Sequence, residues 1–443
     1  MNALETTVLS QISIHDMSPF DFLKGIGGLP AYASRALVCP GLVVAGCQST
    51  DSLQSLQQNF HWLQKLQIGA QELTVLEGEN LLRSLTHPVP STVLLRFPFF
   101  LENGWPISFF LSRNMEQLVS AIGCGWDSIA TPRPDIANIF DDKHYVRCLA
   151  LKLNLHKAFP AWQFISSNLQ DLYSARKRIL ATADPPTDTV FLKVHDFDGG
   201  EGILRWERST PQEKVMAYAE KYLHRGLIMD AGYPREDFGM QEFSLKVMIN
   251  ENGYEPLYVS RQRIRNDAHV GNEVALGETL LRTELYESLL GLVDPICRDA
   301  VKRGYGKGRS RTMGVDFMVV PNSGGHKILL LEINARTTAA DYAMAVCLQA
   351  APRFGGNAAV IMENLNNLPN GIDHDSLRDR FLHGTAWDGT NKPGFILSNA
   401  ACLAYGKITA FAIGKDMAEA NEVFRRLMPE SRQKHATALD ARA

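Results

Sequence analysis

The stretch LLLEINAR, residues 329–336, ends an apolar run with three polar side chains that can do chemistry. Four successive apolar residues, 328–331, predict a buried strand, because they leave no face for water. Alternate residues of a strand point the same way, so Glu332, Asn334 and Arg336 are expected on one side. The strand is therefore expected to end by aiming an acid, an amide and a guanidinium at one place.

A second acid can join this group through a hairpin. The strands GVDFMVV (314–320) and KILLLEIN (327–334) are separated by PNSGGH, a turn-rich connection, so Asp316 is expected near Glu332 and Asn334. Their oxygen atoms suit a hard cation, Mg²⁺ in particular. Arg336 would then lie where a phosphoryl oxygen needs a fork of donors. The competing interpretation is a plain Glu332–Arg336 salt bridge, which leaves Asp316 and Asn334 unexplained.

A second group of candidates lies in FLKVHDFDGGEGILRW, residues 191–206. Lys193 stands in an otherwise apolar strand, which is unfavourable unless an anion neutralises it. The glycines that follow it would let backbone N–H groups approach a phosphate and let the loop open and close. These glycines are Gly199, Gly200 and Gly202. The alternative is an ordinary glycine turn, which the metal set and a second lysine, Lys143, make the weaker interpretation.

The segment SRQRIRND (260–267) carries three arginines at alternate positions. Alternation along a strand would place Arg261, Arg263 and Arg265 on one side, facing either a binding cleft or water. In the first case we expect Arg263 to contact an anionic group. A solvated face is the alternative.

Composition restricts the class of protein. The chain has 443 residues, a net charge of −3, 45% hydrophobic and 21% charged residues, which predicts several ordinary domains and no attraction to nucleic acid. Its seven cysteines form no C-x-x-C pair, which favours a reducing compartment. No signal peptide and no apolar run long enough to span a bilayer is found. We therefore expect a soluble, cytoplasmic, multidomain protein with no membrane partner.

Hydrophobic periodicity predicts the elements that position these residues. Strand and helix patterns alternate over the first 130 residues, which predicts an open α/β sheet, and a boundary is expected in the turn-rich stretch 125–138. Expected helices cover 51–69, 112–123, 141–155, 168–183, 211–226, 278–303 (broken at Pro295), 338–350 and 416–428. Expected strands cover 36–46 (with a turn), 72–76, 91–97, 189–194, 203–207, 227–230, 243–249, 255–262, 314–320, 327–334, 394–402 and 407–414.

The order of these features resembles the ATP-grasp superfamily of carboxylate–amine ligases. It runs D-K, a lysine in an apolar strand, G-G-x-G, an acidic hinge, D-F and E-I-N-x-R, over about residues 130–355. The resemblance implies an α/β (α+β) fold with an N-terminal α/β pre-ATP-grasp domain (1–130). The ATP-grasp domain (131–360) would hold its nucleotide lid at about 156–235, and a small α/β extension would follow (361–443).

The resemblance also implies roles for the candidate residues. Lys143, Lys193 and the three glycines would contact the phosphates of ATP, and Arg336 would contact the transferring phosphoryl group. Arg263 would steady an acyl phosphate or a substrate carboxylate. Two Mg²⁺ ions, for which Mn²⁺ can substitute, would be held by the metal set Asp316, Glu332 and Asn334. The stretch RGLIMDAG falls where the family has its adenine hinge, so Asp230 would hold the ribose, although the family more often has Glu there.

Within the superfamily, the segment 242–273 and the glycine-rich N-terminus look most like peptide ligases of the pheganomycin type. This implies that the protein joins a small-molecule carboxylate to an amine. The substrates would be amino acids or peptides, and the reaction would pass through an acyl phosphate and release ADP. An ATP-grasp kinase, a biotin-dependent carboxylase and a non-catalytic ATP-binding module are the alternatives. A homodimer is left open.

Overall fold

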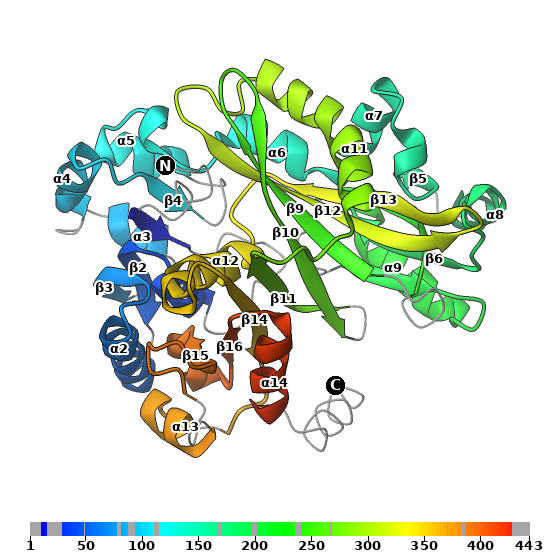
Figure 1. Ribbon diagram of the computed structural model, residues 1–443. Helices are drawn as coiled ribbons and strands as arrows, with labels where there is room; N and C mark the ends of the chain where they lie inside the picture. The colour runs from blue at the N-terminus through cyan, green and yellow to red at the C-terminus, as the bar shows by residue number, and fades with distance from the viewer. Residues whose placement is uncertain are drawn as a thin grey trace. The chain divides into compact units, whose positions relative to one another are not determined.

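The computed structural model describes most of the chain (Figure 1). The described residues are 10–15, 29–47, 49–77, 81–86, 94–109, 115–166, 171–196, 202–234, 241–265, 268–369, 371–381 and 386–427. Contacts divide the chain into two compact units. Unit 1 comprises Met1–Pro132, Val270–Leu280 and Arg336–Ala443, and unit 2 comprises Arg133–His269 and Leu281–Ala335. The division into three domains made from the sequence remains a prediction. No helix among the described residues is long and apolar enough to cross a membrane.

Unit 1 opens with a parallel sheet in the order β3-β2-β1-β4, as the alternation of strand and helix patterns predicts. Its strands are β1 (Gln11–Ile14), β2 (Gly41–Cys47), β3 (Ala70–Glu77) and β4 (Ile107–Phe109). The connecting helices are η2 (Leu29–Val38), α2 (Thr50–Lys65), α3 (Leu81–Thr86), η3 (Leu94–Arg96), α4 (Phe97–Glu102) and α5 (Met115–Ile122). Helix α2 is the one predicted at 51–69, and Ser49 caps its first turn through the amide of Ser52.

Two strand predictions in this part of the chain are wrong over part of their length. Residues 94–97, predicted as strand, form η3 and the start of α4, because Pro98 favours the first turn of a helix. Leu94, Phe97 and Phe100 are buried at a spacing of three, which is the helical face of this segment. The start of the strand predicted at 36–46 likewise belongs to η2, and the strand itself begins at Gly41. A short apolar run does not distinguish a strand from a buried helical turn.

The rest of unit 1 contains an antiparallel sheet in the order β11-β14-β16-β15. Its strands are β11 (Ala268–Leu276, in unit 1 from Val270), β14 (Ala358–Leu365), β16 (Ile408–Gly414) and β15 (Gly394–Ser398). The helices α12 (Ala339–Ala350), α13 (His374–Phe381) and α14 (Met417–Leu427) accompany it.

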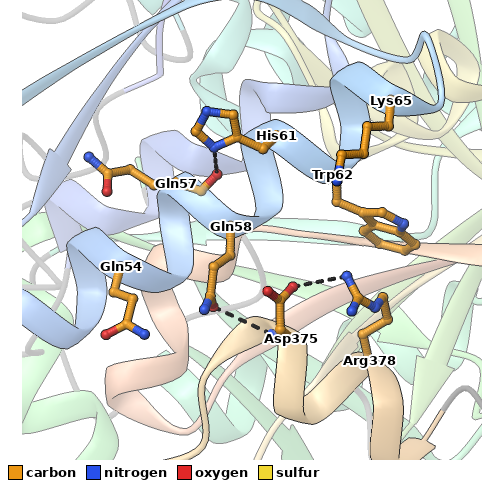
Figure 2. A pocket seen from close by; sticks show the side chains of 8 residues that line it. All are labelled: Gln54, Gln57, Gln58, His61, Trp62, Lys65, Asp375 and Arg378. Carbon is orange, nitrogen blue, oxygen red and sulfur yellow. Dashed lines mark hydrogen bonds and ion pairs between the residues drawn. The ribbon is translucent and has the colours of Figure 1, made fainter.

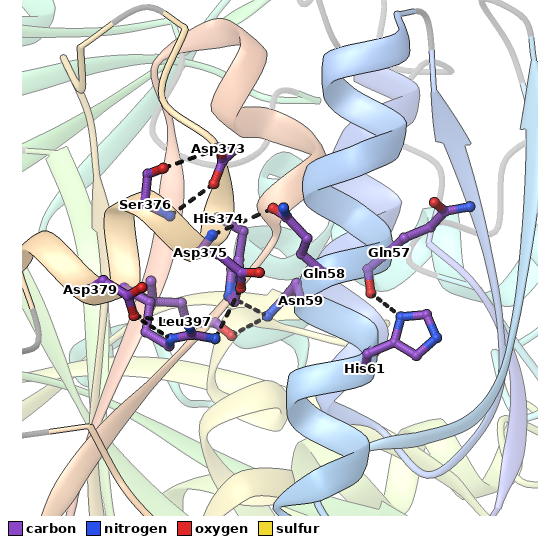
Figure 3. A network of polar contacts seen from close by, with 11 residues as sticks. Gln57, Gln58, Asn59, His61, Asp373, His374, Asp375, Ser376, Asp379 and Leu397 are labelled. Atoms are coloured by element: carbon purple, nitrogen blue, oxygen red, sulfur yellow. Dashed lines mark hydrogen bonds and ion pairs between the residues drawn. The ribbon is translucent and has the colours of Figure 1, made fainter.

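A buried polar network joins α13 to α2 (Figure 3). The side-chain amide of Asn59 on α2 lies 3.2 Å from His374 Nε2 and donates to the carbonyl oxygen of Leu397 over 2.7 Å. Burial lowers the pKa of His374 to about 4, against the opposing effect of Asp375. At neutral pH the histidine is therefore an uncharged part of the core.

Unit 2 is built around an antiparallel sheet in the order β13-β12-β9-β10. The strands are β9 (Gln241–Ile249), β10 (Tyr254–Arg265), β12 (Arg311–Asn322) and β13 (Gly325–Asn334), and the β12–β13 hairpin is the one predicted. One face packs on α6 (Pro134–Asp141), α7 (Lys143–Lys152) and α11 (Thr283–Lys302), which bury a common apolar core. The predicted break at Pro295 is wrong: α11 continues through it, because its buried face outweighs one lost hydrogen bond.

A smaller antiparallel sheet of unit 2 has the order β5-β8-β6-β7. Its strands are β5 (Trp162–Ile165), β6 (Thr189–Val194), β7 (Ile203–Trp206) and β8 (Leu227–Gly232), and its helices are α8 (Asp171–Thr182) and α9 (Gln212–Tyr222). We call it the small sheet. It corresponds to the segment that the sequence assigned to the nucleotide lid.

Candidate active site

A β-bulge at Leu331 sets the direction of the predicted metal ligands. Asp316 pairs with Glu332, but the next residue of β12, Phe317, pairs with Leu330, so Leu331 has no partner across the hairpin. Ile328 and Leu330 before the bulge, and Ile333 after it, belong to the same core cluster. Without the bulge, strict alternation would turn Glu332 and Asn334 toward that core. With it, both lie on the opposite face, which they share as predicted.

Asp316 is the centre of a hydrogen-bonded group on this face. The side-chain amide of Asn334 donates to Asp316 Oδ2 over 3.0 Å. Ser244 on β9 and Gln262 on β10 also hydrogen-bond to Asp316. Burial and, to a lesser extent, the Glu332 charge raise the pKa of Asp316 to about 6, although these hydrogen bonds act the other way. The sequence analysis did not identify Ser244 and Gln262, but each is a polar residue inside a strand pattern.

Lys143 lies at the start of α7, against Glu332. Asp142 caps this helix by accepting from the amides of His144 and Tyr145 over 2.8 and 3.0 Å. The Nζ atom of Lys143 is 3.0 Å from Glu332 Oε2, and the lysine is largely buried. The structure thus joins Lys143, which is expected to contact phosphate, with Glu332 of the metal set.

Asp230 is the anionic partner of Lys193, the lysine in the apolar strand. Lys193 Nζ on β6 and Arg147 Nη2 on α7 each lie 3.1 Å from Oδ2 of Asp230, which is 1% exposed. Burial alone would raise the pKa of Asp230, but the charges and hydrogen bonds of Arg147 and Lys193 outweigh it and lower the pKa. The second oxygen of Asp230, Oδ1, is buried and has no hydrogen-bond partner within the described ranges. The ribose contact assigned to Asp230 from the sequence remains a prediction.

Arg147 connects the small sheet to the bulge. Its Nη1 atom donates to the carbonyl oxygen of Leu331 over 2.9 Å, while Nη2 donates to Asp230. The guanidinium lies over the ring of Phe159, 4.4 Å from its centroid. Arg147 follows Lys143 by four residues, so one face of α7 carries both cations. No sequence pattern singled out Arg147, because its partners are distant in the chain.

His195 holds the end of β6 to the start of α7. Its Nδ1 atom is 3.1 Å from Asp142 Oδ2, and its carbonyl oxygen accepts from the amide of Lys143 over 3.1 Å. The contact with the Asp142 carboxylate raises the pKa of His195, against partial burial. In Asp142, burial favours a higher pKa, but the contact with His195 and the hydrogen bonds from the amides of Tyr145 and His144 outweigh it and lower the pKa. These contacts fix the strand of Lys193 beside the helix of Lys143.

The predicted glycine loop is only partly described. Gly199 and Gly200 lie outside the described residues. Gly202 has a φ of +62° and its carbonyl oxygen accepts from the Val194 amide over 3.2 Å and from the Tyr218 hydroxyl. A positive φ favours glycine, so Gly202 fits the closure of the β6–β7 hairpin. Its phosphate contact remains a prediction.

The predicted arginines occupy other positions. Arg261 pairs with Phe243, whose ring belongs to the core, so by alternation Arg263 and Arg265 lie on that side, opposite Gln262 and Asp316. The shared side of the three arginines agrees with their spacing. Arg336 is buried and is the first residue of the third segment of unit 1. The substrate contacts assigned to Arg263 and Arg336 remain predictions.

A groove in unit 1 is distinct from these residues (Figure 2). It measures about 350 Å³ and lies between α2 and α13. Its lining residues are Gln54, Gln57, Gln58, His61, Trp62, Lys65, Asp375 and Arg378. The charged pair in it, Arg378 and Asp375, is already joined over 2.9 Å. In the described part of the chain, no group of three or more His, Cys, Asp or Glu side chains could hold a metal ion; the predicted set has two acids and one amide.

Comparison with known proteins identifies the fold. No protein-family model matches the chain, and no curated protein does. An N5-carboxyaminoimidazole ribonucleotide synthetase, solved as an ADP complex, aligns with a TM-score of 0.51 at 13% identity over 89% of this chain and 97% of its own. The Thermus thermophilus enzyme of that name aligns with a TM-score of 0.50 at 13% identity, over 94% of this chain and 97% of its own. Rhizobium etli pyruvate carboxylase aligns with a TM-score of 0.52 at 12% identity, over 90% of this chain and 36% of its own. The chain therefore has the mixed α/β ATP-grasp fold that the motif order predicts.

Proposed function

We propose that the protein is an ATP-dependent, ADP-forming ligase that activates a carboxylate as an acyl phosphate and joins it to an amine. The observation that carries the proposal is the convergence of Asp316, Glu332 and Asn334 on one face of an ATP-grasp sheet, with Lys143 paired to Glu332. The donor atoms fit a divalent cation, since two carboxylates and one amide offer only hard oxygen ligands. Bound Mg²⁺ would neutralise the terminal phosphates of ATP.

The ion pairs suggest how the chain accommodates a polyanion. Lys143 is paired with Glu332, and Lys193 is paired with Asp230. When ATP binds, the two ammonium groups turn to its phosphates, and Glu332 becomes available to the cation. Asp230 keeps Arg147 as a partner, so no buried carboxylate is left without a counter-charge. The site exchanges internal pairs for pairs with its substrate.

The reaction then follows from charge neutralisation and positioning. A carboxylate oxygen of the substrate attacks the γ-phosphorus, the bond to the β-phosphate oxygen breaks, and ADP leaves. The amine nitrogen attacks the acyl carbon, inorganic phosphate leaves, and the nitrogen loses a proton. Arg336 would stabilise the transferring phosphoryl group. The loop that contains Gly199, Gly200 and Gly202 would keep water from the acyl phosphate.

Two kinds of acid substrate are distinguished by experiment. The first is an amino acid or peptide carboxylate, as the resemblance to pheganomycin-type ligases implies. The second is bicarbonate, because the names of the structural neighbours describe a carboxyamino-compound synthetase and a carboxylase. Phosphate release would be measured with MgATP for amino acid and dipeptide pairs and, in parallel, for bicarbonate with amines. Release that requires both an acid and an amine supports the ligase. ATP binding without turnover across the whole panel would favour a binding module.

A further inference from the structure

Arg35 of η2 is a buried cation without an anionic partner among the described residues. It is 8% exposed, and its Nε atom is buried without a hydrogen-bond partner. The guanidinium makes no hydrogen bond or ion pair with any residue in the described part of the chain. Its neighbours are the rings of Tyr32 and Tyr342, whose centroids lie 5.4 and 5.8 Å from Cζ. Aromatic faces attract a cation but do not replace an anion, so this charge is placed as if for a ligand.

The residues beside Arg35 lie at a position where α/β sheets commonly bind ligands. From β1 the sheet grows outward on one side through β2 and β3. The chain then adds β4 on the other side of β1, so the strand order reverses between β1 and β4. Crevices outside the carboxyl ends of strands at such a point are the usual binding place. His15 directly follows the carboxyl end of β1, and its Nε2 atom is 3.3 Å from the Ser108 hydroxyl of β4.

Tyr342 links this point to Arg35. Its hydroxyl lies 2.8 Å from His15 Nδ1, and its ring contacts the guanidinium. Burial lowers the pKa of His15 to about 3, although Asp341 acts the other way, so the imidazole is neutral and contributes hydrogen bonds only. Asp341 itself accepts from the amide and hydroxyl of Thr338 at the start of α12.

We propose that Arg35, His15, Ser108 and Tyr342 form a binding site for the carboxylate group of a small molecule. A guanidinium fork matches a carboxylate in two parallel hydrogen bonds, and the hydroxyl groups add neutral partners. The site has one cation, and the Asp341 carboxylate acts electrostatically on His15, so a single negative charge is favoured over a phosphate dianion. The inference rests on unit 1 alone and does not depend on the proposed ligase activity.

The test compares Arg35→Met with the unchanged full-length protein. Thermal unfolding would be followed with acetate, glycine, N-acetylglycine or inorganic phosphate, each against chloride at equal ionic strength. We expect at least one of the three carboxylates to raise the Tm of the parent, and Arg35→Met to weaken its Kd at least tenfold. Arg96→Met, which removes an exposed arginine of the same unit, should respond as the parent does. Without added anion, Arg35→Met should unfold at the parent temperature or above, since it loses an uncompensated charge.

Four results would overturn the proposal. These are no response of the parent to any carboxylate, an equal response of Arg35→Met, a lower anion-free Tm of Arg35→Met, and a phosphate response that depends on Arg35 and exceeds that of every carboxylate. If Arg35→Met does not fold, Tyr342→Phe takes its place. It removes one hydroxyl, and an unchanged Kd for the same carboxylate would then contradict the site.

Discussion

Arg147 donates a hydrogen bond to the carbonyl oxygen of Leu331, the bulged residue whose extra place in β13 directs Glu332 and Asn334. The same guanidinium holds Asp230, the partner of Lys193. One buried side chain therefore connects the partner of Lys193, which is expected to meet phosphate, with the strand expected to hold the cation.

Replacement of Arg147 should be among the most damaging changes in unit 2. Arg147→Met would leave the bulge carbonyl unpaired and Asp230 with one counter-charge, so we expect a loss of about 3 kcal/mol in the free energy of unfolding. Denaturant unfolding measures it. The double variant with Asp230→Asn should recover part of the loss, because it also removes the buried negative charge. Strictly additive losses would show that the two groups do not act as a pair.

Glu332→Gln should abolish turnover while the protein stays folded. An amide is neutral and a much poorer partner for a hard cation, so the metal set would lose most of its affinity. Turnover at matched Mg²⁺ would be compared with Glu255→Gln, a change of an exposed glutamate on β10 that should behave as the parent. Activity of Glu332→Gln within about threefold of the parent would remove this residue from the metal site.

Gln262 and Arg263 are neighbours in sequence but lie on opposite sides of β10, which separates their roles. Gln262→Met removes a hydrogen bond to Asp316 and should weaken the apparent Mg²⁺ affinity by about 10- to 100-fold, as loss of an outer partner commonly does. Arg263→Met should leave the Mg²⁺ requirement unchanged and, if it meets the substrate, raise the KM of the acid. The same Mg²⁺ dependence in both variants would contradict the assignment of Gln262.

The Asp142–His195 pair should make stability depend on pH. The pKa of His195 is raised, so its stabilisation is complete below the usual value of about 6.5 and is lost as pH rises through the folded-state value. The pKa of Asp142 is lowered, so its part is present above its usual value and is lost in acid. His195→Gln should thus lower the Tm most at about pH 5.5 and least at about pH 9. His156→Gln, at an exposed histidine, is the control, and a Tm difference that does not vary with pH would disprove the account.

The hairpin and the shared face of Asp316, Glu332 and Asn334 could be predicted from the sequence because strand periodicity and turn residues are local. The bulge at Leu331 could not be predicted, since it exists only in the register with β12. The roles of Arg147 and Gln262 could not be predicted for the same reason, because their partners lie on other elements. The strand predicted at 91–97 failed where a proline and a spacing of three turned an apolar run into helical turns.

The nucleotide product tests the central claim most directly. A carboxylate that attacks the γ-phosphorus leaves ADP, whereas attack on the α-phosphorus leaves AMP and pyrophosphate. Chromatography of the nucleotides, with hydroxylamine present to trap an acyl phosphate as a hydroxamate, would be performed with the best acid from the screen. We predict ADP that depends on the acid, a hydroxamate in equal amount, and a stable amide only when amine replaces hydroxylamine. AMP as the main product would contradict the mechanism, and ADP with a phosphorylated alcohol would identify a kinase instead.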